Sequence, residues 1–215
     1  MNELELINKA QALVGLTAEE IASQLDISLP VSRIKGKGWM GQAVEKLLGA
    51  TAHSKPLPDF INLGIELKTL SVNLDGKPKE STYICVAPFP TIETNWEDSI
   101  FYLKTRKILW VPILSDSNLS LDKHRILSPF LWQPSAFIDA IFKQDWEELT
   151  EFLNIGQAAT LTAHRGQFIQ IRPKAAHSRV RNPILDEELQ PNHTVPKGFY
   201  LRRHFVLDLL AQHFK

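Results

Sequence analysis

Asp59, Glu66 and Lys68 are the residues whose types and spacing best suit chemistry on a phosphate ester. In an extended strand, residues two apart lie on one face, roughly 6–7 Å from each other. The alternation of apolar and charged residues over 65–70 predicts such a strand, with Glu66 and Lys68 on one face and the intervening apolar residues in the core. Asp59 lies in the irregular segment before the strand, where it can fold back toward Glu66.

These three residues predict metal-assisted hydrolysis of a phosphodiester. Carboxylates supply the hard oxygen ligands that Mg²⁺ prefers, and Mg²⁺ keeps several waters and takes phosphate oxygens as further ligands. A bound Mg²⁺ lowers the pKa of a water, and a nearby lysine can orient that water. Glu45, on a predicted helix upstream, could add another carboxylate. The pattern alone is weak, because alternating charges on a strand usually form a solvent-exposed face. Glu45, beside Lys46, is in isolation better explained as a residue of a surface helix.

The elements that must position these residues follow from the local sequence. The N-terminal segment predicts two helices, the second beginning with the capping box TAEE at 17–20. A loop rich in glycine and lysine leads into a short helix over 43–48, with Gly49 as its C-cap. After the strand at 65–70, Asp75-Gly76 predicts a hairpin-like turn into a buried strand over 83–87.

The second half of the chain alternates helices and strands. The patterns predict helices around 97–104 and 135–153, strands over 107–113 and 168–172, and a C-terminal helix through Phe205 and Phe214. This order predicts the α/β class, with a mixed sheet flanked by helices, and the length of 1–215 suits one domain with two closely joined lobes. The segment 178–196 has the least pattern and is predicted to be a mobile loop, and the single cysteine, Cys85, is expected in the core.

Charge is unevenly distributed along the chain. The formal net charge is zero, yet the stretch from 165 to 203 has eight basic and three acidic residues and so carries +5. Such a division suits a protein that binds phosphates with one part and a metal ion with another, although the charge alone is better explained by chance clustering on a solvated surface. The sequence has no apolar run long enough to span a bilayer, and its N-terminus is acidic where a signal peptide is basic, so we expect a cytoplasmic protein.

Several further motifs follow one another from about residue 34 to the end of the chain. They include KGWMG at 37–41, EKLLGA at 45–50, LGIELKT at 63–69, CVAP at 85–88, DWEEL at 145–149, IRPKAA at 171–176 and PKGFYL at 196–201. Together these motifs resemble the MutH family of DNA mismatch-repair endonucleases, and so many matches in one order are specific.

This resemblance implies a fold and a set of active-site residues. The fold would be restriction-endonuclease-like, a mixed sheet flanked by helices in which two lobes form a DNA cleft. Asp59 and Glu66 would hold Mg²⁺, Lys68 would act on the attacking water, Glu45 would complete the acidic cluster, and Lys104 matches a further active-site lysine of the family.

The resemblance also implies a set of DNA-binding residues. Arg172 and Lys174 fall where the family contacts bases and phosphates, Tyr200 matches the tyrosine associated with sensing adenine methylation, and Lys37 lies in the first matching motif. The residues themselves support this assignment, because Pro173 stiffens the loop and a cation can reach guanine in the major groove. Plain phosphate contacts by Arg172 and Lys174 are an equally good interpretation.

The resemblance implies Mg²⁺-dependent nicking of the unmethylated strand at hemimethylated GATC sites in mismatch repair. It also implies double-stranded DNA and the ATPase MutL as partners. The sequence itself has no phosphate-binding loop for ATP, so any ATP dependence would come from a partner, and the protein is expected to be a monomer. One alternative is a restriction endonuclease of the same family that cuts both strands, which would need a dimer or a second site. The other is a non-catalytic DNA-binding module, which has no reason to hold carboxylates against phosphates.

Overall fold

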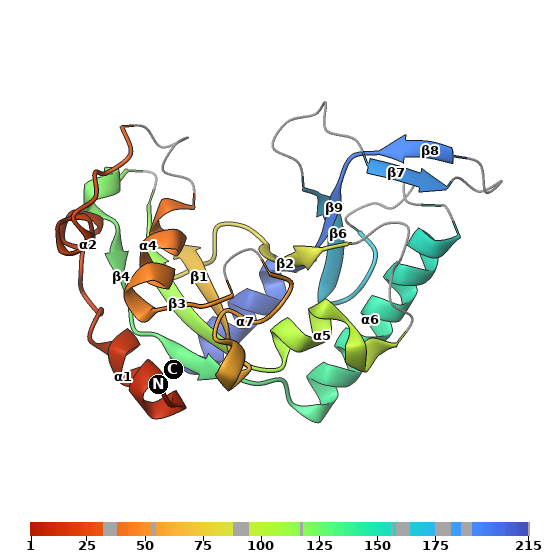
Figure 1. Ribbon diagram of the computed structural model, residues 1–215, viewed down its shortest axis with the longest axis horizontal. Helices are drawn as coiled ribbons and strands as arrows, with labels where there is room; N and C mark the ends of the chain where they lie inside the picture. The colour runs from red at the N-terminus through yellow and green to blue at the C-terminus, as the bar shows by residue number, and fades with distance from the viewer. Residues whose placement is uncertain are drawn as a thin grey trace. The chain divides into compact units, whose positions relative to one another are not determined.

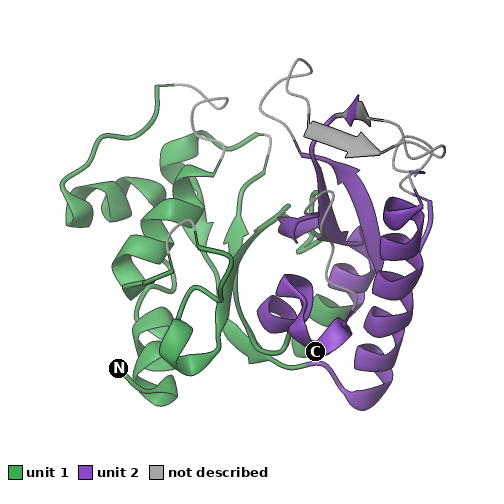
Figure 2. Cartoon of the chain, turned by 45° about the vertical axis from the view of Figure 1, so that its right-hand side comes forward, with its two compact units in different colours: residues 1–80, 106–133, 209–215 green, residues 81–105, 134–208 purple. Residues whose placement is uncertain are grey.

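The chain forms two compact units, each assembled from separate segments (Figure 2). The computed structural model describes residues 1–31, 38–52, 55–87, 95–116, 118–155, 157, 164–174, 182–185 and 191–214. Unit 1 comprises Met1–Glu80, Arg106–Gln133 and Leu209–Lys215, and unit 2 comprises Ser81–Thr105 and Pro134–Asp208. No helix in the described ranges is long and apolar enough to cross a membrane.

Unit 1 is built on a mixed sheet (Figure 1). Its strands are β1 (Glu66–Val72), β3 (Ile108–Leu114), β4 (Arg125–Ile126) and β5 (Phe130–Trp132). β1 runs parallel to β3, with Glu66 opposite Ile108 and Lys68 opposite Trp110, while β4 and β5 pair with β3 in the antiparallel sense. β1 is therefore the end strand of this sheet.

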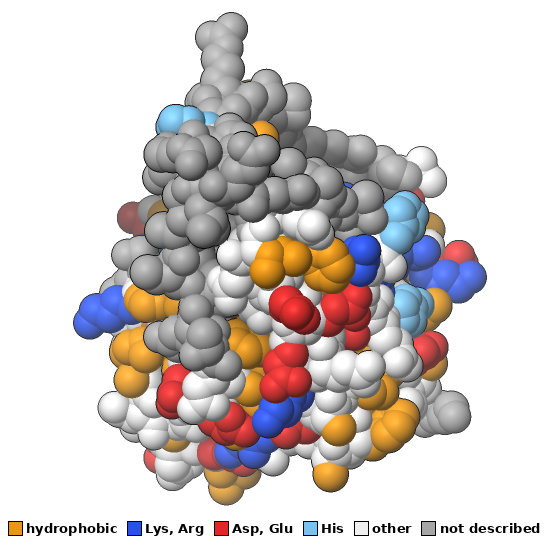
Figure 3. Space-filling model, turned by 90° about the vertical axis from the view of Figure 1, so that its right-hand side faces the viewer, with side chains coloured by type: hydrophobic (Ala, Val, Ile, Leu, Met, Phe, Trp, Pro, Cys, Tyr) orange, Lys and Arg blue, Asp and Glu red, His pale blue; other side chains and the backbone are white. Residues whose placement is uncertain are grey.

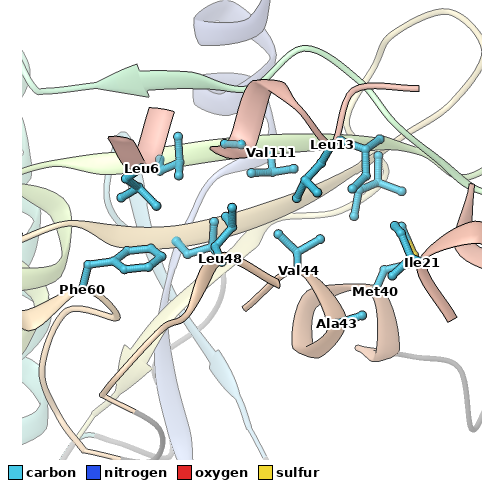
Figure 4. Packing of buried hydrophobic residues seen from close by; sticks show 14 of the residues in the cluster. Leu6, Leu13, Ile21, Met40, Ala43, Val44, Leu48, Phe60 and Val111 are labelled. Carbon is cyan, nitrogen blue, oxygen red and sulfur yellow. The ribbon is translucent and has the colours of Figure 1, made fainter. Parts of the chain in front are cut away.

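Three helices pack on the sheet of unit 1 through one hydrophobic core. They are α1 (Glu3–Gln11), α2 (Ala18–Leu25) and α4 (Trp39–Leu48). Val44 and Leu48 of α4 share this core with Leu67 of β1 and Val111 of β3 (Figure 4). Both expected helix ends are confirmed: Thr17 and Glu20 form a reciprocal capping box, and Gly49 ends α4 in the left-handed conformation, at a φ of 78°.

Unit 2 is built on an antiparallel sheet covered by aromatic residues. The strand order is β2 (Thr82–Val86), β9 (Lys197–Leu201) and β6 (Ile169–Pro173). The helices of unit 2 are α5 (Ile100–Thr105), which follows the short η2 (Trp96–Asp98), and α6 (Ala136–Asn154). α7 (Arg203–His213) follows β9, and its residues from Leu209 on belong to unit 1. The rings of Phe101 and Phe199 lie edge to face at 5.8 Å, and Cys85, the single cysteine, lies in the buried interior as expected.

The turn predicted at Asp75-Gly76 is present, but the strand after it does not pair with the strand before it, so the hairpin prediction is wrong. The turn closes only locally, through a bridge between Val72 and Pro78. β2 then pairs with β9 in unit 2 and not with β1. A turn motif fixes only the local reversal of the chain, whereas the sheet that the next strand joins depends on residues far away in sequence.

The loop predicted over 178–196 is also partly wrong. Two short strands, β7 (Asn182–Leu185) and β8 (Pro191–Thr194), pair there in the antiparallel sense, and residues 178–181 and 186–190 lie outside the described ranges. Neither strand alternates apolar and polar residues, and each contains a proline, which normally demotes a segment to an edge strand. Backbone pairing, which leaves no signature in the side chains, makes this ribbon.

Asp145 on α6 fixes the start of β6. Its buried carboxylate accepts hydrogen bonds from the backbone amides of Gln167, Phe168 and Ile169, at 2.7, 2.6 and 2.8 Å. The carboxylate thus satisfies three donors of the turn that leads into the strand carrying Arg172.

We expect Asp145→Ala to lower the free energy of unfolding by at least about 3 kcal/mol, because one buried and two partly buried amides lose a charged acceptor. Asp145→Asn keeps one acceptor oxygen and should lose less. Urea denaturation of both variants checks this expectation. An Ala variant as stable as the unmodified chain would show that water can replace the carboxylate.

Candidate active site

Glu66 and Lys68 lie on one face of the end strand β1. Glu66 is almost completely buried, with 1% of its side chain exposed, and Lys68 is 15% exposed. Lys68 Nζ donates to Glu66 Oε1 at 2.5 Å. A buried carboxylate is costly without a charged partner, and the neighbouring ammonium supplies that partner. The sequence predicts the shared face but not the burial of Glu66.

A tight reversal of the chain brings Asp59 back beside β1. The reversal is formed by the 3₁₀ turn η1 (Ile61–Leu63) and by Gly64, whose φ of 61° is in the left-handed region. Phe60 and Ile65 form a bridge across it, and the Leu67 amide donates to Asp59 Oδ2 at 2.8 Å. The carboxylate of Asp59 therefore lies next to the residue that follows Glu66, as the sequence predicts.

Glu45 lies on α4, which is joined to the same region. Gly41 of α4 faces β1 so closely that a Cβ built on it would lie 3.1 Å from Thr69 Oγ1. Glu45 is one helical turn further on, half-buried, and the Thr51 amide beyond α4 donates to the backbone carbonyl of Asp59 at 2.9 Å.

The helix α4 packs on the Leu67 face of β1, whereas Glu66 points from the opposite face. Glu45 would thus have to reach the site around the edge of the sheet. In the described ranges, no three acidic, histidine or cysteine side chains gather closely enough to hold a metal ion. Membership of Glu45 in the site stays a prediction, and Lys46 is exposed on α4.

The other residues predicted for the active site belong to unit 2 or lie outside the described ranges. Lys104 is half-buried on α5 and belongs to unit 2, whereas Asp59, Glu66 and Lys68 belong to unit 1. Lys37 lies outside the described residues. The structure therefore groups two carboxylates and one lysine, and the roles of Lys104 and Lys37 stay predictions.

The donor set of Asp59 and Glu66 fits Mg²⁺. Both side chains offer carboxylate oxygens, the hard ligands this ion prefers. Mg²⁺ is commonly held by one or two carboxylates and completes its octahedron with waters and substrate phosphate oxygens, so a larger protein cage is not required. Among the described residues, neither a thiolate nor an imidazole belongs to this group.

Unit 2 presents a second group of predicted residues on one face of its sheet. Tyr83 of β2 and Tyr200 of β9 are paired in register, and their rings meet edge to face at 5.3 Å. Lys174 Nζ lies 4.2 Å from the centre of the Tyr83 ring, and Arg172 Cζ lies 5.8 Å from the centre of the Tyr200 ring. We call Tyr83, Arg172, Lys174 and Tyr200 the tyrosine–cation face.

The backbone of β9 makes room for this face. A Cβ built on Gly198 would lie 2.8 Å from Tyr83 Cε2 and 3.0 Å from the carbonyl oxygen of Cys85, so only glycine admits the ring at this position. The sequence does not mark Tyr83 as a candidate site residue. The apolar run around it predicts a wholly buried strand, and its cross-strand partner, Tyr200, lies over a hundred residues away.

The positive charge of the C-terminal third does not spread over every surface of unit 2. On the side where α6 lies, acidic, basic and apolar side chains are intermixed (Figure 3). Lys143 of α6 pairs with Glu97 at 3.6 Å, and Arg165 pairs with Glu148 at 3.3 Å. The net charge of the segment therefore does not locate a contact with nucleic acid on unit 2. The tyrosine–cation face is a more specific candidate for that contact.

Glu66 and Lys68 on one strand, Asp59 bonded beside that strand, and a face of tyrosines and cations in unit 2 are the features of an enzyme of the DNA-cleaving class. Comparison with known proteins agrees with this class. The family model of the DNA mismatch repair enzyme MutH matches residues 48–145. The DNA mismatch repair protein MutH of Shewanella sp. (strain W3-18-1) is 42% identical over 214 residues, which are 99% of this chain and 96% of that protein.

The MutH protein of Yersinia enterocolitica is 40% identical over 214 residues, or 99% of this chain and 94% of that protein. The chain belongs to the MutH family of DNA mismatch-repair enzymes. The family predicted from the sequence motifs is thereby confirmed, and with it the prediction of a mismatch-repair endonuclease.

We expect Gly198→Ala to weaken DNA binding by about tenfold or more, because the added Cβ must displace the Tyr83 ring and so disturb Lys174 and Tyr200, which lie against it. Fluorescence anisotropy with a GATC duplex in Ca²⁺ measures the effect, and thermal melting controls for folding. A folded variant with unchanged affinity would show that the Tyr83 ring is not part of the DNA interface.

Proposed function

We propose that this chain uses Asp59, Glu66 and Lys68 to nick the unmethylated strand of hemimethylated GATC sites in a Mg²⁺-dependent reaction. The observation that carries the proposal is the placement of two carboxylates beside one stretch of β1. Asp59 is hydrogen-bonded to the Leu67 amide, and the adjacent Glu66 is bonded to Lys68. Membership of the MutH family supports the same assignment.

Asp59 and Glu66 would hold the metal ion. When bound, Mg²⁺ would lower the pKa of a water and offset the negative charge that develops on the phosphate. The hydrogen bond from the Leu67 amide holds Asp59 Oδ2 in place, which reduces the side-chain entropy lost when the site is assembled.

Lys68 would act on the water and on the phosphate. An ammonium group next to a metal-holding carboxylate can donate to the attacking oxygen or to a phosphate oxygen as charge accumulates there. Its bond to Glu66 keeps the ammonium at the reacting centre before DNA arrives. We further propose that Glu45 and Lys104 complete the site once DNA is bound.

DNA recognition would fall to the tyrosine–cation face and to Lys37. Arg172 is exposed and can present paired N–H donors to guanine in the major groove, while Lys174 and Lys37 would hold phosphates. Tyr200 is half-buried beside Arg172, and its ring would pack against the N6 edge of adenine. A methyl group on N6 of the strand to be cut would then clash with the ring.

The proposed setting is the cytoplasmic mismatch-repair system. We propose a restriction-endonuclease-like arrangement in which one copy of the chain encloses the duplex with its two units. The ATPase MutL would be the activating partner. If it is, MutL with ATP should increase the nicking rate without changing the cleavage position.

Asp59→Asn and Glu66→Gln should each abolish nicking, while DNA affinity in Ca²⁺ stays within about threefold of the unmodified chain, because each change removes a metal ligand and none of the main phosphate contacts. The near-isosteric changes preserve volume, and the amide introduced at position 59 keeps an oxygen that can accept from Leu67. Glu19→Gln, on the exposed side of α2, is the matched control for loss of one acidic charge. Full activity in either site variant would refute the metal assignment.

Tyr200→Ser should retain cleavage of unmethylated GATC within about tenfold and gain cleavage of fully methylated GATC, because removal of the ring removes the steric clash. Single-turnover rates on the two duplexes measure this change. A folded variant that still refuses methylated sites would assign methylation sensing to another residue.

A further inference from the structure

Ser81 makes a direct contact with the cation that we assign to base recognition. Arg172 Nη1 donates to Ser81 Oγ at 2.7 Å. Ser81 lies immediately before β2 and is 9% exposed, whereas Arg172 lies near the end of β6 and is exposed. The bond therefore joins a fixed, largely buried residue to a long side chain that would otherwise move freely in solvent.

Two contacts together define the orientation of the Arg172 guanidinium. Ser81 holds one of its terminal nitrogens, and the ring of Tyr200 lies 5.8 Å from Cζ. A guanidinium is planar, with its five N–H donors in a fixed fork, so contacts at one edge and one side restrict the direction of the remaining donors. Recognition of a base edge by a pair of donors requires such a fixed direction, whereas attraction to phosphate does not.

We propose that Ser81 is a positioning residue for sequence recognition: it holds Arg172 in the orientation needed to distinguish GATC from other sequences. The inference rests on the proposed function of Arg172. Ser81 would contribute little to the general grip on DNA, because the charge of Arg172 remains without it. It would contribute to discrimination, because an unrestrained arginine loses more side-chain entropy when it docks on a base.

The proposal differs from a purely structural role for Ser81. Arg172 is an exposed residue, so removal of Ser81 Oγ leaves Arg172 Nη1 open to water and not buried without an acceptor. We therefore expect Ser81→Ala to melt close to the temperature of the unmodified chain. Ser81→Thr keeps the hydroxyl and should retain discrimination.

The test is a double-mutant cycle on DNA affinity in Ca²⁺, with a GATC duplex and a duplex in which both G·C pairs of the site are changed to A·T. The chains compared are the unmodified protein, Ser81→Ala, Ser81→Thr, Arg172→Ala and the double variant Ser81→Ala/Arg172→Ala. We expect Ser81→Ala to reduce the affinity ratio of the two duplexes about tenfold, within the range for one paired base contact, with the salt dependence unchanged. Ser81→Ala should have no further effect when Arg172 is already alanine.

The outcomes separate this inference from the proposed function. If Arg172→Ala reduces discrimination and folded Ser81→Ala does not, the role of Ser81 is refuted while that of Arg172 stands. If Arg172→Ala weakens both duplexes equally, base recognition by Arg172 fails, and the inference about Ser81 fails with it. Additive losses in the double variant would refute positioning through Arg172 and show that Ser81 contacts DNA by itself. Should Ser81→Ala fold poorly, Ser81→Cys, which keeps the volume with a weaker acceptor, replaces it in the same cycle.

Discussion

Two carboxylates must be held together at the start of one strand against their mutual repulsion and, for Glu66, against the cost of burial. Two neighbouring groups of β1 offset these costs: the Leu67 amide binds Asp59, and the ammonium of Lys68 binds Glu66. Both partners belong to the same strand as Glu66, so their positions depend on the pairing of β1 with β3. The parallel register, with Lys68 opposite Trp110, thus underlies the whole site.

In the proposed function, cleavage and DNA recognition would fall on different compact units. The carboxylates and Lys68 are in unit 1, and the tyrosine–cation face is in unit 2. Acidic groups that attract a metal ion and basic groups that attract phosphates would weaken one another if they were intermixed, because opposite charges pair at close range. A net charge of zero is therefore compatible with strong DNA binding when the charges are separated in this way.

Local patterns predicted the parts of the site that depend on neighbouring residues. The alternation around Glu66 predicted β1, and the glycine after Leu48 predicted the end of α4. Pairing between distant segments was not predictable in this way. β9 has no alternation that marks it as a strand, so the meeting of Tyr83 with Tyr200 and of Ser81 with Arg172 became visible only in the structure. The burial of Glu66 was not predictable either, because it depends on residues distant in sequence that cover its face of β1.

If Asp59, Glu66 and Lys68 form the cleavage site and Tyr200 senses the methyl group on adenine, the chain cuts only a strand that is unmethylated. The most direct measurement incubates the chain, MutL and ATP in Mg²⁺ with hemimethylated, unmethylated and fully methylated GATC duplexes whose two strands carry different labels. The account predicts a cut in the unmethylated strand of the hemimethylated duplex, cuts in either strand of the unmethylated duplex, and an intact methylated duplex. Equal cutting of both strands of the hemimethylated duplex, or no cleavage of any duplex, would contradict it.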